Sequence, residues 1–426
     1  MTVSKLPPRH SAKELVNHRL RRFFYSTLAV VLFITSFGAM AWHDLQSSVN
    51  QIDANQFRIG NRPNKPVDDD YDGRAVNILV MGTDSRQGAN NIDGGAATES
   101  SARSDTTMIM HISADRKRIQ VVSIPRDTMV EIPECKSADG TITDSMYAQF
   151  NTAFANGAGN GDLSARALAA GAACAISTVE KLTNIYIDDY MVVDFAGLKN
   201  MVDALGGVGV YVSEDIDDPE YTQLKLDKGC HHLDGSAAIM YARVRHGVSD
   251  GSDLHRIERQ QNLMGAMMRT AMRKNLLTST PDLYAFAKAA LGTLTTSPHV
   301  GQLNTLAGLA MSVRTIGFGG IEFITAPNET DPDDPNRVVL REKEANALWK
   351  ALKADKPAPS NTITSTANGT PAPAATATAT ETEDPTQETE PSTEETTQAP
   401  APKASSPAPA PKAPASPTTD PALQCK

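Results

Sequence analysis

Arginines gather in one short stretch of a chain that is otherwise acidic. Residues 241–261 contain Arg243, Arg245, Arg256 and Arg259, whereas the whole 426-residue chain has a formal net charge of -10. Guanidinium groups are planar, stay charged and can grip two oxygens at once, so such a cluster is suited to phosphate or diphosphate. The alternative is a solvated, salt-bridged helix start that follows an edge strand.

The spacing within this stretch predicts how the side chains are presented. Arg243 and Arg245 are two residues apart, so in an extended segment both would leave the same face. A helix that begins near Ser252 would carry Arg259 on a different side from its main polar stripe. The residues spaced i, i+3 and i+7, which would share that stripe, are Asp253, Arg256 and Gln260.

A carboxylate follows an apolar run in the first part of the chain. Residues 75–81 are mostly apolar and are followed by Gly82-Thr83-Asp84. Asp84 would therefore stand at the carboxyl end of a buried strand, where open α/β sheets place their ligands.

The next two apolar runs predict a hairpin. Residues 106–113 and 118–124 are expected to be strands, with a two-residue loop at 115–116. That loop sets Asp105 directly opposite Arg126. One carboxylate and one arginine would then lie at the same sheet edge, close to Asp84.

Four separated motifs occur in a fixed order: Gly-Thr-Asp-Ser-Arg, Arg-Ser-Asp-Thr, Ser-Ile-Pro-Arg-Asp, and Asp-Leu-x-Arg-x-x-Arg-Gln-Gln preceded by Ala-Arg-Val-Arg-His. From residue 75 to the mid 340s the chain resembles the LytR-CpsA-Psr family of cell-wall glycopolymer ligases. The resemblance implies an α/β fold in which a central mixed sheet is sandwiched by helices. It also implies transfer of a wall polymer from a polyprenyl-diphosphate carrier onto peptidoglycan or another surface glycan acceptor.

The resemblance assigns roles to individual residues. The positions that match the magnesium-site aspartates are Asp84 and Asp105. Those that match the diphosphate-binding, catalytic arginines are Arg126, Arg243, Arg245 and Arg256. The remaining polar positions of that site are Asp253 and Gln260, and we add as candidate substrate contacts Arg86, Arg103 and Arg259. The sequence departs from the family pattern at His255 and in the Gly/Asn-rich insertion at residues 87–101.

These assignments predict a mechanism. Mg²⁺ held by Asp84 and Asp105 would bridge the phosphate oxygens while the arginines absorb charge on the departing polyprenyl phosphate. Asp253 or Asp105 would take the proton of the attacking sugar hydroxyl. Two alternatives are a polyprenyl-diphosphate phosphatase and a non-catalytic protein that binds an anionic wall polymer. The polymer, the acceptor hydroxyl and the oligomeric state are left open.

The N-terminal segment predicts a single-pass membrane protein. Residues 1–22 carry six Lys and Arg against one acidic residue, and residues 23–42 carry no charge. Twenty helical residues at about 1.5 Å each cross a hydrocarbon core of roughly 30 Å. The basic flank places residues 1–22 in the cytoplasm and the bulk of the chain outside. A cleaved signal peptide is the alternative.

Composition divides the rest of the chain. Residues 43–74 are polar and predict a stalk, and residues 75–354 predict the extracytoplasmic catalytic domain. Residues 355–426, built of Pro, Ala, Thr, Ser and Glu without an aromatic residue, predict a disordered tail. That tail carries nine acids and four lysines, so the arginine cluster is a local feature and not a broad basic surface. A nucleic-acid partner is therefore not expected.

The catalytic domain is predicted to end in helices rich in Leu, Met and Ala. Residues 263–268, 283–291 and 303–313 have this composition. Such stripes are usually ordinary core. Together they are expected to line an apolar groove, which the resemblance implies for the polyprenyl tail.

Four cysteines in an extracytoplasmic setting predict disulfides. Joining Cys135 to Cys174 would close the Gly/Asn/Ala-rich loop at residues 136–161, which contributes about 3 to 4 kcal/mol in the chain-entropy model. Two buried free thiols are the alternative. Cys230 with Cys425 is a weaker second pair, because the tail that carries Cys425 is long.

Overall fold

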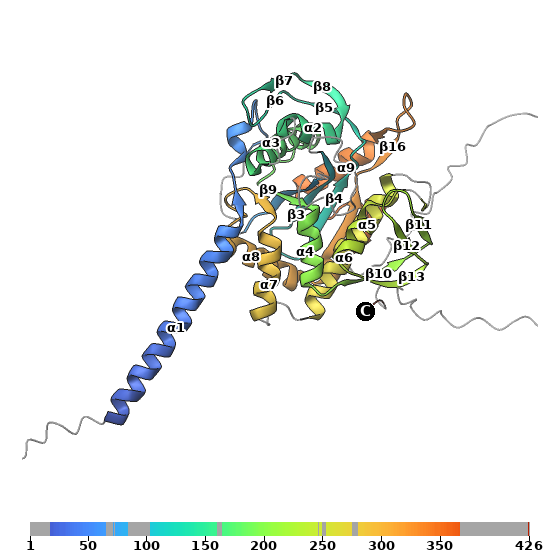
Figure 1. Ribbon diagram of the computed structural model, residues 1–426. Coiled ribbons are helices and arrows are strands. Elements are labelled where there is room, and N and C mark those ends of the chain that lie inside the picture. Colours follow the sequence, from blue (N-terminus) through green and yellow to red (C-terminus); the bar gives the residue numbers. More distant parts are fainter. Residues whose placement is uncertain are drawn as a thin grey trace, which may run out of the picture.

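The computed structural model describes residues 18–64, 71, 73–83, 103–159, 164–245, 247–248, 253–274, 280–366 and 425, without the side chains of residues 18–20, 253 and 280. Its centre is an eight-stranded mixed sheet (Figure 1). In spatial order the strands are β1 (Asn50–Gln51), β14 (Leu294–Thr296), β9 (Asp189–Asp194), β2 (Val76–Thr83), β3 (Ser104–Ile112), β4 (Ile119–Ile124), β15 (Ile321–Thr325) and β18 (Ile363–Thr366). β2 runs parallel to β9, and β4 runs parallel to β15, whereas β3 is antiparallel to both of its neighbours.

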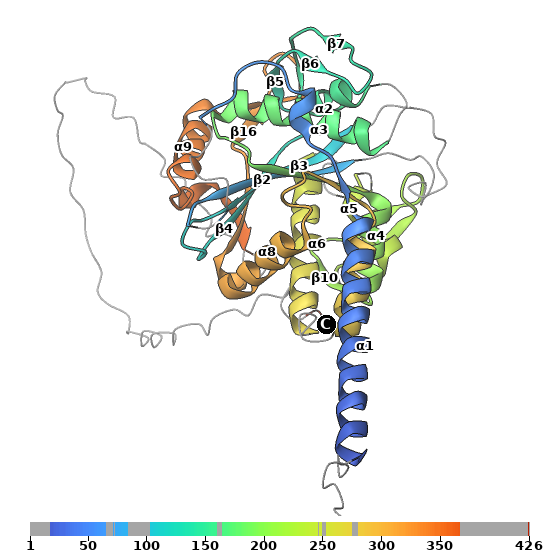
Figure 2. The same cartoon turned by 90° about the vertical axis from the view of Figure 1, so that its left-hand side faces the viewer.

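Helices cover both faces of this sheet (Figures 1 and 2). One face packs against α2 (Phe150–Ala158), α3 (Ala165–Thr183) and α9 (Glu342–Lys353). On the other face α6 (Asp253–Arg273) and α8 (Leu303–Ile316) contact the strands, and beside them lie α4 (Phe195–Ala204), α5 (Gly235–Arg243) and α7 (Thr280–Leu291). The predicted α/β/α sandwich is confirmed.

The central strands are apolar on both sides because both sheet faces are covered. In β2, Leu79 and Met81 join the core under α2 and α3, whereas Val76 and Ile78 join the core under α6 and α8. The small residues of α2 and α3 allow these helices to pack closely. A Cβ added at Gly157 would lie 2.2 Å from the Ala170 carbonyl oxygen, so only glycine fits there.

Two-stranded ribbons and short 3-10 turns lie outside the main sheet. The ribbons are β5 (Met129–Ile132) with β8 (Met146–Gln149), β6 (Cys135–Lys136) with β7 (Ile142–Thr143), β10 (Val208–Val212) with β13 (Gly229–Leu233), β11 (Ile216–Asp218) with β12 (Leu224–Leu226), and β16 (Asn328–Thr330) with β17 (Val338–Leu340). The 3-10 turns are η1 (Ala54–Phe57), η3 (Phe318–Gly320) and η4 (Ser360–Thr362).

The hairpin prediction is confirmed in register and corrected in its loop. Thr107 pairs with Ile124 and Ile112 with Ile119, as predicted. The loop spans residues 113–118 instead of two residues, with Arg116 at a φ of 53°. The longer loop has the same centre, so the pairing of the strands is unchanged.

The strand predicted for Arg243 and Arg245 is wrong. Arg243 is the last residue of α5, which Asp234 caps by accepting a hydrogen bond from the Ala237 amide at 2.8 Å. The helix forms because its apolar residues are buried at helical spacing, and it ends where Val244 turns extended. Arg243 and Arg245 therefore do not share a strand face.

Both predicted disulfides are present. Cys135 in β6 is bonded to Cys174 in α3, with a Cα–Cα distance of 5.3 Å. Cys230 in β13 is bonded to Cys425, with a Cα–Cα distance of 5.2 Å. The second bond attaches the far end of the C-terminal segment to the domain.

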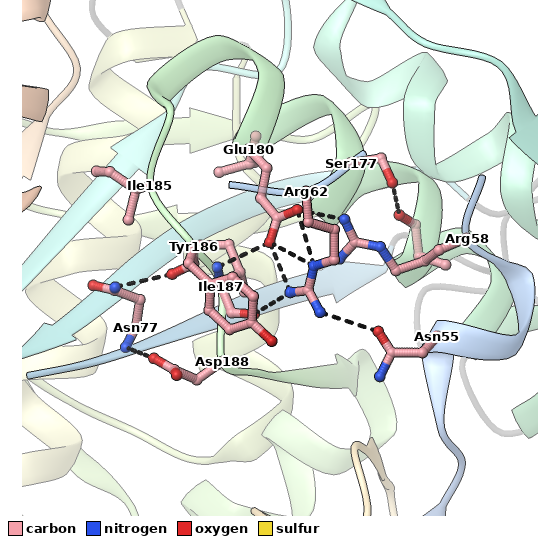
Figure 3. A network of polar contacts seen from close by, with 12 residues as sticks. Asn55, Arg58, Arg62, Asn77, Ser177, Glu180, Ile185, Tyr186, Ile187 and Asp188 are labelled. Atoms are coloured by element: carbon pink, nitrogen blue, oxygen red, sulfur yellow. Dashed lines mark hydrogen bonds and ion pairs between the residues drawn. The ribbon is translucent and has the colours of Figure 1, made fainter. Parts of the chain in front are cut away.

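The prediction of a stalk is contradicted by the structure. α1 (His18–Ser48) leads within two residues into β1, which belongs to the main sheet. After η1, Arg58 and Arg62 both bind the carboxylate of Glu180 in α3 (Figure 3). Arg62 Nη2 also donates to the Ile187 carbonyl oxygen at 2.7 Å. Glu180 is buried, so its charge requires these partners, and they fix residues 50–62 to the domain.

The predicted domain end at residue 354 is also too early. β18 pairs with β15 and adds an antiparallel edge strand, so the sheet extends to Thr366. Such a strand is not recognisable from composition, because its residues are Thr, Ser and a single Ile. Residues 367–424 and 426, which form the rest of the predicted tail, lie outside the described residues.

Candidate active site

Asp105 and Arg126 meet at the sheet edge, as the hairpin register predicts. Arg126 Nη1 donates to Asp105 Oδ1 at 2.8 Å. Arg256, from the first turn of α6, approaches the same aspartate from a distant part of the chain. Its Nη2 donates to the Asp105 carbonyl oxygen at 2.9 Å, and its Nη1 lies 3.6 Å from Oδ2. Two arginines far apart in sequence therefore converge on one carboxylate.

This environment keeps Asp105 ionised. Burial alone would raise the pKa of the Asp105 carboxyl group, but the positive charges of Arg256, Arg126 and Arg245, with the Arg126 hydrogen bond, outweigh it and lower the pKa to about 2. The carboxylate is therefore anionic at neutral pH. Arg245 belongs to the same electrostatic cluster, since its charge acts on Asp105.

The predicted stripe on α6 is confirmed for Arg256 and Gln260. Gln260 Oε1 accepts a hydrogen bond from Thr106 Oγ1 at 2.9 Å, next to the point where Arg256 binds Asp105. The helix begins at Asp253, one residue after the predicted start, but the side chain of Asp253 lies outside the described residues. The stripe therefore joins the start of α6 to the start of β3.

Arg259 lies off this stripe, also as predicted. It is buried, and its Nη2 donates to the Val244 carbonyl oxygen. Burial lowers the pKa of the Arg259 guanidinium from its usual value. The structure therefore places Arg259 under the backbone that leads to Arg245, and its contact with substrate stays a prediction.

Arg243 stands at the end of α5 and faces α4. Its guanidinium carbon lies 4.7 Å from the ring centroid of Phe195, the first residue of α4. Arg243 and Arg245 are both half-buried. α4 begins where β9 ends, so this contact brings Arg243 to the carboxyl edge of the sheet even without the predicted strand.

Asp127 is a part of the site that the sequence did not single out. Its Oδ2 lies 3.3 Å from Arg126 Nε, and its Oδ1 accepts a hydrogen bond from Gln149 Nε2 at 2.6 Å. Arg337 Nη1 lies 3.9 Å from the same Oδ1. Arg126 is thus held between Asp105 and Asp127. Asp127 is the last residue of the Ser-Ile-Pro-Arg-Asp motif, so the motif could have indicated its place in the site.

Two candidate residues lie outside the described residues, namely Asp84 and Arg86. β2 ends at Thr83, which pairs with Ser104, the residue before Asp105. Arg103 is exposed just before β3. The roles assigned to Asp84, Arg86 and Arg103 stay predictions.

The donor chemistry fits the predicted magnesium ion at one position. Asp105 is an ionised carboxylate, the ligand type that Mg²⁺ prefers. Within the described ranges no group of three or more His, Cys, Asp and Glu residues is arranged to hold a metal. A magnesium site here would need Asp84, as the sequence predicts, and the diphosphate itself.

Several half-buried apolar side chains lie on the sheet face that α6 and α8 cover. The half-buried ones under α6 and α8 include Val80, Met110, Met191, Met264, Met268, Leu306 and Leu309. Across the sheet, Leu79, Met81 and Ile109 are fully buried under α2 and α3. The stripes predicted at residues 263–268 and 303–313 are confirmed as helices, and the groove between them stays a prediction.

Residues 41–354 match the LytR_cpsA_psr family. The chain belongs to this family. The matched region contains the described site residues and every strand of the main sheet except β18, so the family resemblance of the motifs is confirmed.

Relatives of known name share this region. The chain is 30% identical over 334 residues to the probable cell wall biosynthesis protein LcpB of Corynebacterium glutamicum, covering 76% of this chain and 69% of that protein. It is 31% identical over 209 residues to the polyisoprenyl-teichoic acid–peptidoglycan teichoic acid transferase TagU of Oceanobacillus iheyensis, covering 49% of this chain and 55% of TagU. The match therefore spans little more than half of TagU.

A solved structure supports the fold. The crystal structure of protein gbs0355 from Streptococcus agalactiae superposes with a TM-score of 0.53 at 20% identity, covering 67% of this chain and 90% of that one. At this identity the likeness concerns the fold alone.

Proposed function

We propose that the protein transfers a glycopolymer from a polyprenyl-diphosphate carrier to peptidoglycan or another surface glycan and releases polyprenyl phosphate. The observation that carries the proposal is the convergence of Arg126, Arg245 and Arg256 on the ionised Asp105. Membership in a family whose relatives include a cell wall biosynthesis protein and a teichoic acid transferase supports it.

The arginine cluster suits a diphosphate because of its geometry. Arg126 follows β4, Arg245 lies in the segment after α5, and Arg256 lies in α6. Three separate segments therefore present planar, two-pronged donors around one carboxylate. Such preorganised charge stabilises the negative charge that develops on a leaving phosphate.

The reaction is a displacement at phosphorus. The oxygen of an acceptor sugar hydroxyl forms a bond to the phosphorus that carries the glycopolymer, and the bond from that phosphorus to the bridging oxygen breaks. The electron pair leaves with polyprenyl phosphate, where the arginines hold the charge. Asp105, with a pKa of about 2, is a weak proton acceptor at neutral pH, so the acceptor proton passes to Asp253 or to solvent.

Asp84 and Asp105 would hold Mg²⁺, which when bound neutralises charge on the diphosphate oxygens. Arg126 and Arg256 orient Asp105 for this role because they fix both its carboxylate and its backbone. The half-buried Met and Leu side chains under α6 and α8 are the surface that suits the polyprenyl chain.

The protein would be anchored by α1 with residues 1–22 in the cytoplasm. Among the described residues, α1 is the one helix long and apolar enough to cross a membrane. A polyprenyl-linked substrate is itself confined to the membrane, so an anchored enzyme and its substrate share one surface. The catalytic domain then lies outside, where the disulfides persist.

Purified full-length protein in nanodiscs tests this function. It is incubated with a lipid-diphosphate sugar, Mg²⁺ and peptidoglycan oligomers, and the products are weighed by mass spectrometry. We expect a phosphate-linked conjugate of sugar and oligomer together with polyprenyl phosphate. A free sugar phosphate formed equally with and without oligomers would indicate a phosphatase instead. Tight binding without any product would indicate a polymer-binding protein.

A further inference from the structure

The end of α1 is fastened to the catalytic domain by polar contacts. Asp44 accepts hydrogen bonds from Tyr284 OH at 2.5 Å and from Lys288 Nζ at 2.7 Å, both in α7. Gln46 Nε2 donates to a backbone carbonyl oxygen in the turn before α8. Gln46 Oε1 accepts from the amide of Leu303, which opens α8. One turn of α1 is thereby tied to two helices of the domain.

Apolar packing and strand pairing complete the attachment. Leu45 and Val49 pack with Leu291, Leu294 and Leu303. The next residues form β1, which pairs in parallel with β14 at the edge of the main sheet. α1 therefore continues directly into the domain core without a flexible segment.

This attachment fixes the level of the membrane surface. The uncharged span ends at Trp42, and Asp44 follows two residues later, about 3 Å further along a helix axis. Tyr284 and Lys288, which bind Asp44, therefore lie at the level of the lipid headgroups. Tyr and Lys are side chains that favour this interface, because each combines an apolar stem or ring with a polar tip.

The base of the domain lies on the same side. Figures 1 and 2 show the C-terminal end of α6 and the N-terminal end of α7 on the side from which α1 leaves. α6 ends at Arg273, and Lys274 follows it, both exposed. Two exposed cations at this level complement anionic lipid phosphates.

We propose that the base formed by the end of α6 and the start of α7 rests on the lipid headgroups, and that α1 holds it there rigidly. The proposal rests on the membrane anchoring proposed above. The partner of this face is then the bilayer surface, and the domain stays at a fixed height above the membrane.

Fixed height matters because it sets the distance between the site and the lipid headgroups. Val193 of β9 pairs with Leu294, which packs against the end of α1. Two residues after Val193 comes Phe195, whose ring contacts Arg243. Arg256 at the site lies in the first turn of α6 and Arg273 at the base ends the same helix, a rise of about 25 Å along the helix axis. A rigid attachment through α1 therefore keeps the site at a constant distance from the headgroups.

Depth-dependent fluorescence quenching tests the proposal in the full chain. Single cysteines at Ala285 in α7, Thr141 in the β6–β7 turn and Ile34 in α1 are labelled in nanodiscs that contain phosphatidylglycerol. We expect headgroup-linked quenchers to reduce fluorescence strongly at Ala285→Cys and not at Thr141→Cys. Quenchers on the acyl chains should act at Ile34→Cys, which verifies that α1 is inserted.

The outcomes separate this inference from the proposed function. Quenching at position 34 with none at position 285 overturns the docked base but leaves the transfer activity untouched. Loss of quenching at position 34 overturns the anchoring itself, and the docked base with it. In the Asp44→Ala, Gln46→Ala double variant we expect quenching at position 285 to fall, whereas the matched surface variant Asp217→Ala should keep it. Equal quenching in both variants would contradict a rigid attachment through α1.

Discussion

Arg256 contacts Asp105 at two points, the backbone carbonyl oxygen at 2.9 Å and the carboxylate Oδ2 at 3.6 Å. The guanidinium fork therefore fixes the position of the aspartate and lowers its pKa at the same time. This contact joins the start of α6 to the start of β3 and makes the two distant motifs one site.

We predict that Arg256→Lys lowers kcat/KM roughly fivefold to 150-fold, a loss of about 1 to 3 kcal/mol of transition-state stabilisation, because a lysine keeps the charge but cannot make both contacts. Steady-state transfer kinetics measure the effect. The exposed Arg314→Lys serves as the matched control and should behave like the wild type. If the Arg256→Lys enzyme is as active as the wild type, the position supplies only a positive field.

Asp127 offers a test of positioning without substrate contact. Asp127→Ala removes the carboxylate that holds Arg126 from the far side, so we expect about a tenfold loss in kcat/KM. Asp127→Glu should restore part of the loss, and Asp217→Ala, which removes an exposed carboxylate paired with Lys225, should have no effect. Unaltered kinetics in Asp127→Ala would show that Arg126 needs no such support.

The Cys135–Cys174 disulfide is predicted to stabilise the domain. Replacing both cysteines by alanine should lower the free energy of unfolding by about 3 to 4 kcal/mol, because the 39-residue separation is released in the unfolded chain. Urea denaturation measures the change. The Cys230→Ala, Cys425→Ala double variant, which keeps the Cys135–Cys174 bond, serves as the comparison. If loss of the Cys135–Cys174 bond leaves the free energy of unfolding unchanged, the bond does not stabilise the domain.

Stability is predicted to fall in mild acid because of His111. Burial lowers the pKa of His111 below its usual 6.5, and its hydrogen bond to Asp355 only partly opposes this. The unfolded chain then binds a proton that the folded chain resists, so the stabilising contribution is present above pH 6.5 and is lost as the pH falls below it. Urea titrations of wild type and His111→Gln should differ in slope below pH 6.5. Identical slopes would exclude His111 as the source.

The sequence predicted those parts of the site that depend on local periodicity. The β3–β4 register followed from the centre of its loop, and the Arg256–Gln260 stripe followed from the helical period. The Arg-Val-Arg spacing led to a wrong prediction, because two arginines at this spacing can lie in a strand or at the end of a helix. Residues 50–62 are held by partners more than a hundred residues away in the sequence. The edge strand β18 pairs with a strand about forty residues away. A local sequence pattern cannot predict either contact.

The most direct test of the central claim is the mass of the products formed by the Asp105→Asn enzyme beside the wild type. Each is incubated with lipid-diphosphate sugar, Mg²⁺ and peptidoglycan oligomers, and its fold is checked by circular dichroism. We predict the conjugate and polyprenyl phosphate from the wild type, and neither from the folded Asp105→Asn enzyme or from wild type in excess chelator. Conjugate formed at an undiminished rate by Asp105→Asn, or in chelator, would contradict a transfer centred on Asp105 and its metal.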